Sequence, residues 1–100
     1  MQLAKVRGTV VSTQKEPSLQ GVKFLLVQLL DDQGNPLPKY QVAADSVGAG
    51  VDEWVLVSLG SAARQVPRRG DRPVDAAVIA IVDTVSVENR ILYSKKDQYR

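Results

Sequence analysis

Residues 45–64 read DSVGAGVDEWVLVSLGSAAR, and this stretch combines three kinds of local structure. A glycine-rich loop at 48–50 precedes an apolar strand at 54–59, and Ser61 then caps a short alanine-rich turn of helix. Pro67 keeps that helical turn short. The stretch offers carboxylates beside small residues and no other group typical of catalysis. It therefore favours a surface at which two backbones approach closely.

Four other segments have the alternation or the apolar content of β-strands. They lie at 4–10, 22–30, 40–44 and 76–87. Gly8 falls on the apolar side of the first, where a glycine often marks the sharp bend of a barrel corner. The helical period of 3.6 residues is not sustained in any segment. The sequence therefore predicts an all-β fold, a small five-stranded OB-like β-barrel with one short helical turn.

Two of these strands are apolar on both faces. In the strand at 22–30, one apolar face carries Val22, Phe24, Leu26 and Leu30, and the opposite face carries Leu25, Val27 and Leu29. The segment 76–82 shows the same pattern. A small barrel has one interior, and antiparallel strands usually alternate, so the second face needs another cover. We expect a second subunit to provide it, with loops and the tail of the same chain as the alternative.

The length of 100 residues predicts one domain, 1–100, in which residues 94–100 form a polar C-terminal tail. The longest apolar run, 76–82, is too short to span a bilayer, and the charges near the N-terminus are unlike a signal peptide. We therefore expect a cytoplasmic protein with no membrane contact. The net charge of +2 is weak, so a pI of ≈ 9.1 indicates a solvated surface of mixed sign rather than nucleic-acid binding.

The residue types that most often carry catalysis are missing, since the chain has no His and no Cys. Their absence removes the commonest general base, the thiolate nucleophile and most zinc sites. The carboxylate pairs Asp31-Asp32 and Asp52-Glu53 are adjacent, and adjacent strand residues point to opposite faces. The loop at 47–51 lacks the spacing of a phosphate-binding loop. The sequence predicts no enzyme activity, no catalytic residue, no cofactor and no metal.

One basic cluster precedes the last predicted strand, and it consists of Arg64, Arg68, Arg69 and Arg72. A nucleic-acid site would need aromatic side chains among these cations for base stacking, and the cluster has none. A solvated basic loop is the simplest interpretation, and a salt-bridging contact with a neighbouring protein is the more specific one. A nucleic-acid-binding OB-fold module stays open as an alternative function.

A family resemblance runs through three segments in order, which are GVKFLLVQ at 21–28, the stretch at 45–64 and VDAAVIAIVD at 74–83. Together they resemble the pentameric vertex proteins of bacterial microcompartments, the CcmL/EutN family, and the likeness covers nearly the whole chain. The EW pair at 53–54 and the end LYSKKDQYR at 92–100 are most similar to the cyanobacterial carboxysome branch.

The resemblance implies a structural role. It implies a homopentamer that caps the vertices of a carboxysome-type polyhedral shell in the cytoplasm and so supports carbon dioxide concentration and fixation. The implied partners are hexameric shell proteins and, through them, enclosed rubisco and carbonic anhydrase. The residues implied at the subunit interface or pore are Gly48, Ala49 and Gly50. The candidate residues for docking onto a neighbouring shell protein are Arg64, Arg68, Arg69 and Arg72.

Overall fold

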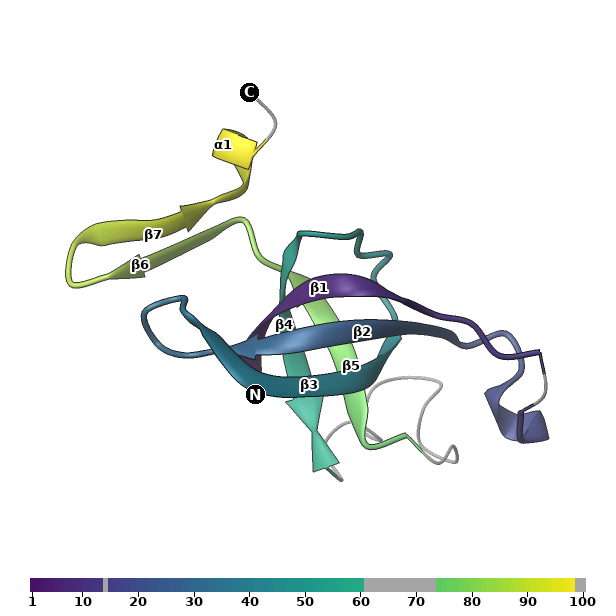
Figure 1. Ribbon diagram of the computed structural model, residues 1–100. Coiled ribbons are helices and arrows are strands. Elements are labelled where there is room, and N and C mark those ends of the chain that lie inside the picture. Colours follow the sequence, from purple (N-terminus) through teal and green to yellow (C-terminus); the bar gives the residue numbers. More distant parts are fainter. Residues whose placement is uncertain (14, 61–73, 99–100) are drawn as a thin grey trace.

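The computed structural model describes residues 1–13, 15–60 and 74–98. Five strands form a closed barrel in the order β1-β2-β3-β5-β4 (Figure 1). Their bounds are β1 Gln2–Val10, β2 Lys23–Leu30, β3 Pro36–Asp45, β4 Trp54–Leu59 and β5 Ala76–Ile81. Neighbouring strands are antiparallel, except that β3 and β5 run parallel. The predicted five-stranded barrel is confirmed, whereas the helical turn expected at 61–64 lies outside the described residues.

Alternate residues of the strands fill the barrel interior, because successive side chains of a strand point to opposite faces. The largest fully buried side chains are Val6, Leu25, Val27, Val55, Val57 and Val78. Each such side chain contributes roughly 1.5–3 kcal/mol by leaving water. On β2, Leu25, Val27 and Leu29 face the barrel interior. The sequence pattern places the same three residues together on one face of the strand.

β1 bends near Gly8, as the position of this glycine predicts. The register with β2 shifts between Val6 and Gly8, which leaves Arg7 as the extra residue of a β-bulge. β1 pairs with β4 over residues 2–5 and with β2 over residues 4–10. One continuous strand therefore joins the two sides of the barrel.

The outer face of the barrel carries a second apolar cluster. Its buried members are Val22, Ala44, Val74 and Ala77, and the side chains packed against them are Leu19, Phe24 and Ile79. Segments of the same chain therefore cover this part of the second face, as the alternative in the sequence analysis expects. Tyr40 and Val42 on β3 stay exposed, by 58% and 44%. Those two side chains lie on the part of the face that the described chain leaves open.

The prediction of a single strand over 76–87 is wrong beyond the first half of that segment. β5 ends at Ile81, and β6 (Thr84–Val87) pairs with β7 (Arg90–Ser94) in a separate two-stranded sheet. Figure 1 shows this hairpin projecting away from the barrel. The polar tail expected from residue 94 also has regular structure, since α1 (Lys95–Gln98) follows β7 directly.

The break between β5 and β6 has a backbone cause. Val82 donates its N–H to the carbonyl of Trp54 (N···O 2.8 Å), and the chain then leaves the barrel at Asp83. Glu88 and Asn89 form the hairpin turn with φ of 49° and 65°, since tight hairpin turns need positive φ at both central residues. The turn has no glycine, so the usual sequence signal for a hairpin is missing.

Helices are short in the described part of the chain. The 3-10 helix η1 (Pro17–Leu19) lies between β1 and β2, and α1 follows β7. Neither helix has the length or the apolar content needed to cross a membrane.

Candidate functional site

The carboxylate of Asp45 holds the glycine loop from within. Its Oδ1 accepts hydrogen bonds from the N–H groups of Val47 and Gly48, both at 3.0 Å, and its Oδ2 accepts one from Ala49 at 3.1 Å. The side chain of Asp45 is almost fully buried, and Lys23 Nζ lies 3.7 Å from Oδ2. A buried charge is tolerated when it is hydrogen-bonded and paired in this way. The loop is therefore a defined turn at the end of β3.

Glu53 holds the far side of the loop and ties it to the C-terminal segment. Its Oε1 accepts a hydrogen bond from the N–H of Gly50 at 2.6 Å, and its Oε2 lies 2.7 Å from Lys95 Nζ. The hydrogen bond from Lys95, and then the one from Gly50, lower the pKa of Glu53, although burial acts in the opposite direction. Glu53 is therefore ionised at neutral pH and joins two distant parts of the chain.

The backbone donors of the loop are used inside the subunit. The four N–H groups of residues 47–50 all point at the carboxylate of Asp45 or of Glu53. A phosphate would need these donors, because backbone N–H groups are what such loops use to bind anions. It would also meet two negative charges. The geometry therefore disfavours phosphate binding, in agreement with the missing sequence spacing.

The three predicted loop residues have different surroundings. Gly48 has a φ of +79°, a region that glycine adopts without steric cost. Ala49 is 1% exposed and packs in the barrel core, so the subunit itself covers almost all of this residue. A Cβ on Gly50 would lie 3.3 Å from a carboxylate oxygen of the same subunit. The exposed apolar side chains of the loop are those of Val47 and Val51.

A stacked aromatic pair anchors the hairpin to the barrel. The ring centroids of Trp54 on β4 and Tyr93 on β7 lie 4.3 Å apart, and the ring planes differ by 13°. Gly34 in the β2–β3 turn makes room for Trp54, because a Cβ there would lie 2.6 Å from the indole Cη2. The N–H of Lys95 adds a hydrogen bond to the carbonyl of Asp83 at 2.9 Å. The hairpin thus leaves the barrel in a defined direction.

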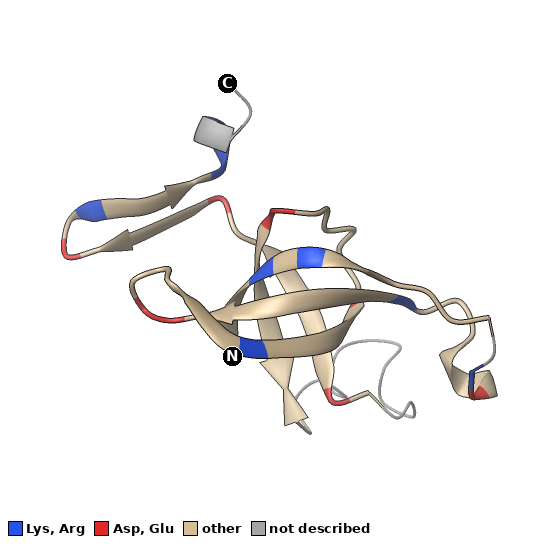
Figure 2. Cartoon of the chain, viewed as in Figure 1, with Lys and Arg blue, Asp and Glu red and all other residues tan. Residues whose placement is uncertain are grey.

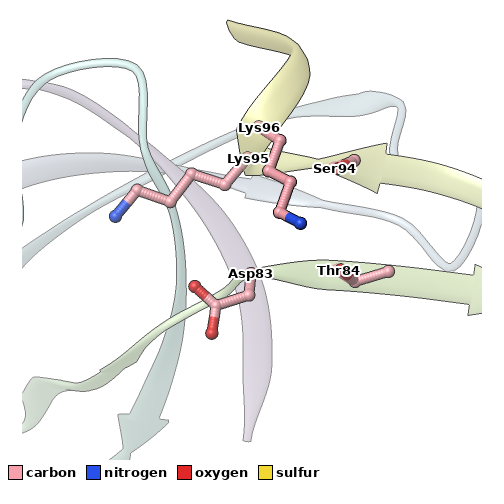
Figure 3. Close-up of a pocket in the computed structure, with 5 residues that line it drawn as sticks. All are labelled: Asp83, Thr84, Ser94, Lys95 and Lys96. Atoms are coloured by element: carbon pink, nitrogen blue, oxygen red, sulfur yellow. The ribbon is translucent and has the colours of Figure 1, made fainter. Parts of the chain in front are cut away.

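An open cleft of about 410 Å³ lies where the hairpin meets α1 (Figure 3). Its lining residues are Asp83, Thr84, Ser94, Lys95 and Lys96. The groups that line the cleft are two ammonium groups, one carboxylate and two hydroxyls.

The Asp31-Asp32 pair belongs to a turn. Asp31 Oδ1 accepts hydrogen bonds from the N–H groups of Gln33 and Asn35, both at 2.8 Å. The bond from Asn35 has the largest effect, and together these bonds lower the pKa of Asp31. In the described part of the chain, acidic side chains do not gather in groups of three or more as metal ligands would.

Sequence reasoning missed the structural roles of Asp45, Glu53 and Lys95. A local signal existed for Asp45, because an Asp side chain often accepts hydrogen bonds from the next few N–H groups in a turn. No local signal existed for Glu53, whose partner Lys95 is brought to it only by the fold.

The predicted basic cluster lies outside the described residues, and it comprises Arg64, Arg68, Arg69 and Arg72. Among the described aromatic side chains, Tyr40 is 58% exposed, and one exposed ring does not make a stacking platform for nucleic acid. Trp54 and Tyr93 stack on each other, and Phe24 packs against the second apolar cluster. The nucleic-acid alternative therefore gains no support from these rings.

Comparison of the sequence with known proteins identifies one family. The family described as "Ethanolamine utilisation protein EutN/carboxysome" matches residues 1–83. The carboxysome shell vertex protein CcmL of Gloeobacter violaceus is 73% identical over the full length of both chains. The bacterial microcompartment shell vertex protein EutN of Salmonella typhimurium is 45% identical over 95% of this chain and 96% of its own.

Solved structures show the same fold. The structure of Gloeobacter violaceus CcmL superposes with a TM-score of 0.93 at 72% identity and covers 97% of this chain and 100% of its own. The GrpN pentameric microcompartment shell protein from Rhodospirillum rubrum superposes with a TM-score of 0.80 at 50% identity and covers 87% of this chain and 99% of its own.

Proposed function

The chain belongs to the EutN/CcmL family, and from this membership we propose that it is a homopentameric vertex protein of a carboxysome-type shell. The observation that carries the proposal is the 73% identity, over all residues, with a carboxysome shell vertex protein. A pentameric relative with the same fold supports the ring of five. The role is structural, since the protein shapes a shell rather than converting a substrate.

A single copy has the unlike surfaces that a ring requires. In a head-to-tail ring, each copy presents one surface to the copy before it and a different surface to the copy after it. The outer face of β3 exposes Tyr40 and Val42, whereas the hairpin exposes Ile91 at another part of the molecule. These separate apolar surfaces support closure by one repeated contact.

A pentamer supplies the curvature that a layer of hexamers lacks. Hexameric tiles alone extend as a flat sheet, and five-fold tiles at icosahedral corners let the sheet close. Hexameric shell proteins are therefore the direct partners, and rubisco and carbonic anhydrase are the enclosed cargo of a cytoplasmic shell that concentrates carbon dioxide for fixation. Support comes from the relatives in Gloeobacter violaceus and Nostoc sp., which are both carboxysome shell vertex proteins.

The glycine loop at 48–50 lies at the subunit contact or around the central pore. Its support is the defined turn capped by Asp45, the positive φ of Gly48 and the exposed side chains of Val47 and Val51. The docking surface for a hexamer includes Arg64, Arg68, Arg69 and Arg72. Charges at the rim of a contact mainly set the encounter rate and the orientation of the partners.

A carboxysome-forming strain that lacks its own vertex protein tests this function. Expression of this chain should restore closed polyhedral shells in electron micrographs and growth at ambient carbon dioxide. A chain that accumulates as pentamers but leaves the shells elongated and open would contradict the vertex role.

A further inference from the structure

We propose that Glu53 couples the glycine loop to the β6–β7 hairpin, so that the docked hairpin holds the loop in place and the two segments loosen together. The glycine loop here is residues 47–51, which lie between β3 and β4. This coupling lies within one chain and goes beyond the proposed pentamer. It makes the order of the loop depend on a C-terminal segment that is distant in sequence.

A single carboxylate makes both contacts. Glu53 Oε1 accepts a hydrogen bond from the N–H of Gly50 at 2.6 Å, and Glu53 Oε2 lies 2.7 Å from Lys95 Nζ. The two oxygens belong to one planar group, so a rotation that breaks one contact also displaces the other. The side chain is largely buried, and hydrogen bonds are stronger where little water surrounds them.

The backbone of Glu53 is fixed to the barrel wall. Its N–H donates to the carbonyl of Gly50 at 3.2 Å, and its carbonyl accepts the N–H of Val6 on β1 at 3.0 Å. The side chain therefore extends from a fixed point, and its orientation is set by its two partners. A displacement of Lys95 is then passed on to Gly50 and is not absorbed by the backbone of Glu53.

Lys95 belongs to the hairpin side of this contact. It follows β7 directly, and its N–H donates to the carbonyl of Asp83 at the base of the hairpin, at 2.9 Å. Two residues earlier, Tyr93 stacks on Trp54, the neighbour of Glu53. Figure 2 shows the acidic colour at the start of β4 and the basic colour where β7 ends. Departure of the hairpin from the barrel would therefore break the stack and the ion pair together.

The two ends of the glycine loop are held by different carboxylates. Asp45 accepts the N–H groups of residues 47–49, which follow it directly in the chain. Glu53 holds the other end, at Gly50. Asp52 beyond it has a φ of 73°, which is uncommon for a residue other than glycine and persists where surrounding contacts fix it. The end at Gly50 should therefore depend on Glu53, whereas the end near Asp45 is held locally.

Coupling between two segments acts in both directions. A partner that orders the hairpin would also order the glycine loop, and a partner that orders the loop would hold the hairpin against the barrel. Because the proposed function assigns the loop to the subunit contact or the pore, this link would let an event at the C-terminal segment change that site.

Amide hydrogen exchange of two matched variants tests the coupling. Lys95→Met removes the ammonium group that contacts Glu53 and keeps an apolar side chain of similar length. Coupling typically changes an equilibrium by roughly 5–150-fold, so exchange at Gly50 should quicken at least about fivefold, together with exchange over 84–94. Lys96→Met removes the same charge from the same cleft, where Figure 3 shows the side chains of the two lysines pointing in different directions. This control should leave exchange at Gly50 unchanged, and a Lys95→Met chain that quickens only over 84–94 contradicts the coupling.

A second pair of variants isolates the route through Glu53. Tyr93→Leu loosens the hairpin without removing any group of Glu53 or of the loop, so it should quicken exchange at Gly50 as well as over 84–94. Glu53→Gln leaves one acceptor oxygen, which can serve Gly50 or Lys95 but not both. In the Glu53→Gln background, Tyr93→Leu should therefore quicken exchange over 84–94 and leave Gly50 at the rate of the single variant. If leucine still holds the hairpin, Tyr93→Ser takes its place.

The outcomes separate this coupling from other routes and from the pentamer. Equal acceleration at Gly50 in both backgrounds means that the hairpin acts on the loop by another route, such as a change of assembly, and overturns the role of Glu53. An unchanged rate at Gly50 in both backgrounds means that Asp45 alone holds the loop, which overturns the coupling itself. A parent that is not pentameric overturns the proposed function and leaves this test unchanged, because the coupling lies within one chain.

Discussion

Asp45 and Glu53 are buried carboxylates whose oxygens accept hydrogen bonds from backbone N–H groups and lie near lysine ammonium groups. Their burial costs free energy, and these hydrogen bonds and charges offset that cost. The sequence predicts that Asp52 and Glu53 do not form an acid/base pair, because adjacent strand residues point to opposite faces. It could not indicate Lys95 as the partner of Glu53, because the two residues meet only after the hairpin has docked at the barrel.

Replacing Glu53 with Gln should lower the free energy of unfolding by about 1.5–3 kcal/mol, the range for a hydrogen bond to a charged group. The amide can still accept the bond from Gly50, but the ion pair with Lys95 is lost. The pKa of Glu53 is lowered by folding. Its contribution is therefore present above the unfolded pKa and is lost as the pH falls through the lower, folded value.

Urea unfolding of both proteins from about pH 7 down to about pH 3 measures this difference. The two stability curves should converge at low pH, because the protonated Glu53 resembles the amide. The lowered pKa of Asp31 changes the stability of both proteins equally with pH, so its effect cancels in the difference between them. Curves that stay parallel over the whole range would rule out this role for Glu53.

Gly48→Val and Gly48→Asn should differ in their effects on folding. The φ of +79° is strained for a β-branched residue, so the valine variant should be destabilised by about 1–3 kcal/mol. Asn tolerates this region, and within the described residues no atom lies within 4 Å of the Cβ position. The asparagine variant should fold normally yet form a weaker ring, as measured by dilution in native mass spectrometry. Unchanged assembly of Gly48→Asn would show that the loop is only a surface turn.

The five barrel strands could be predicted from the sequence, whereas the hairpin could not. The barrel strands alternate or are apolar throughout, and Gly8 marks the bend of β1. The segment 82–87 continues the β-branched pattern of β5, and the turn at 88–89 has no glycine, so nothing local separates the strands. The strands separate where the N–H of Val82 bonds to the carbonyl of Trp54, a residue distant in sequence.

Tyr93→Leu should loosen the hairpin and leave the barrel folded. The stack with Trp54 contributes roughly 0.5–1.5 kcal/mol beyond the burial of its area. Amide hydrogen exchange should therefore quicken over 84–94 and change little in β1 to β5. Trp54 is the only tryptophan, so its fluorescence should shift as its surroundings change. Equal acceleration of exchange throughout the barrel would show that Tyr93 supports the core instead.

The whole molecule is a closed barrel with one projecting hairpin, and Tyr40 and Val42 are exposed on the outer face of β3. The apolar second faces of two strands indicated an oligomer, and part of that signal proves to be the same-chain cluster around Ala44 and Ala77. The family resemblance indicated the number five, which no residue pattern specifies. The interface role of the loop at 48–50 stays a prediction from its glycines, and the burial of Ala49 depends on barrel packing that a single strand does not reveal.

Replacing both Arg68 and Arg69 with Ser should leave the pentamer intact and impair closure of the shell. The proposal places these cations at the rim of the ring, where charge orients an incoming hexamer. Shells made with this variant should elongate or leak in electron micrographs. Normal polyhedral shells would assign the arginines to a solvated loop and move the docking contact to another surface.

The mass of the purified protein in solution tests the central claim most directly. Native mass spectrometry at micromolar concentration should show mainly a species of five times the 10.9 kDa mass of one chain. That result is expected because relatives with the same fold are pentameric shell proteins. A predominant monomer or dimer at that concentration would contradict the pentameric vertex protein described here.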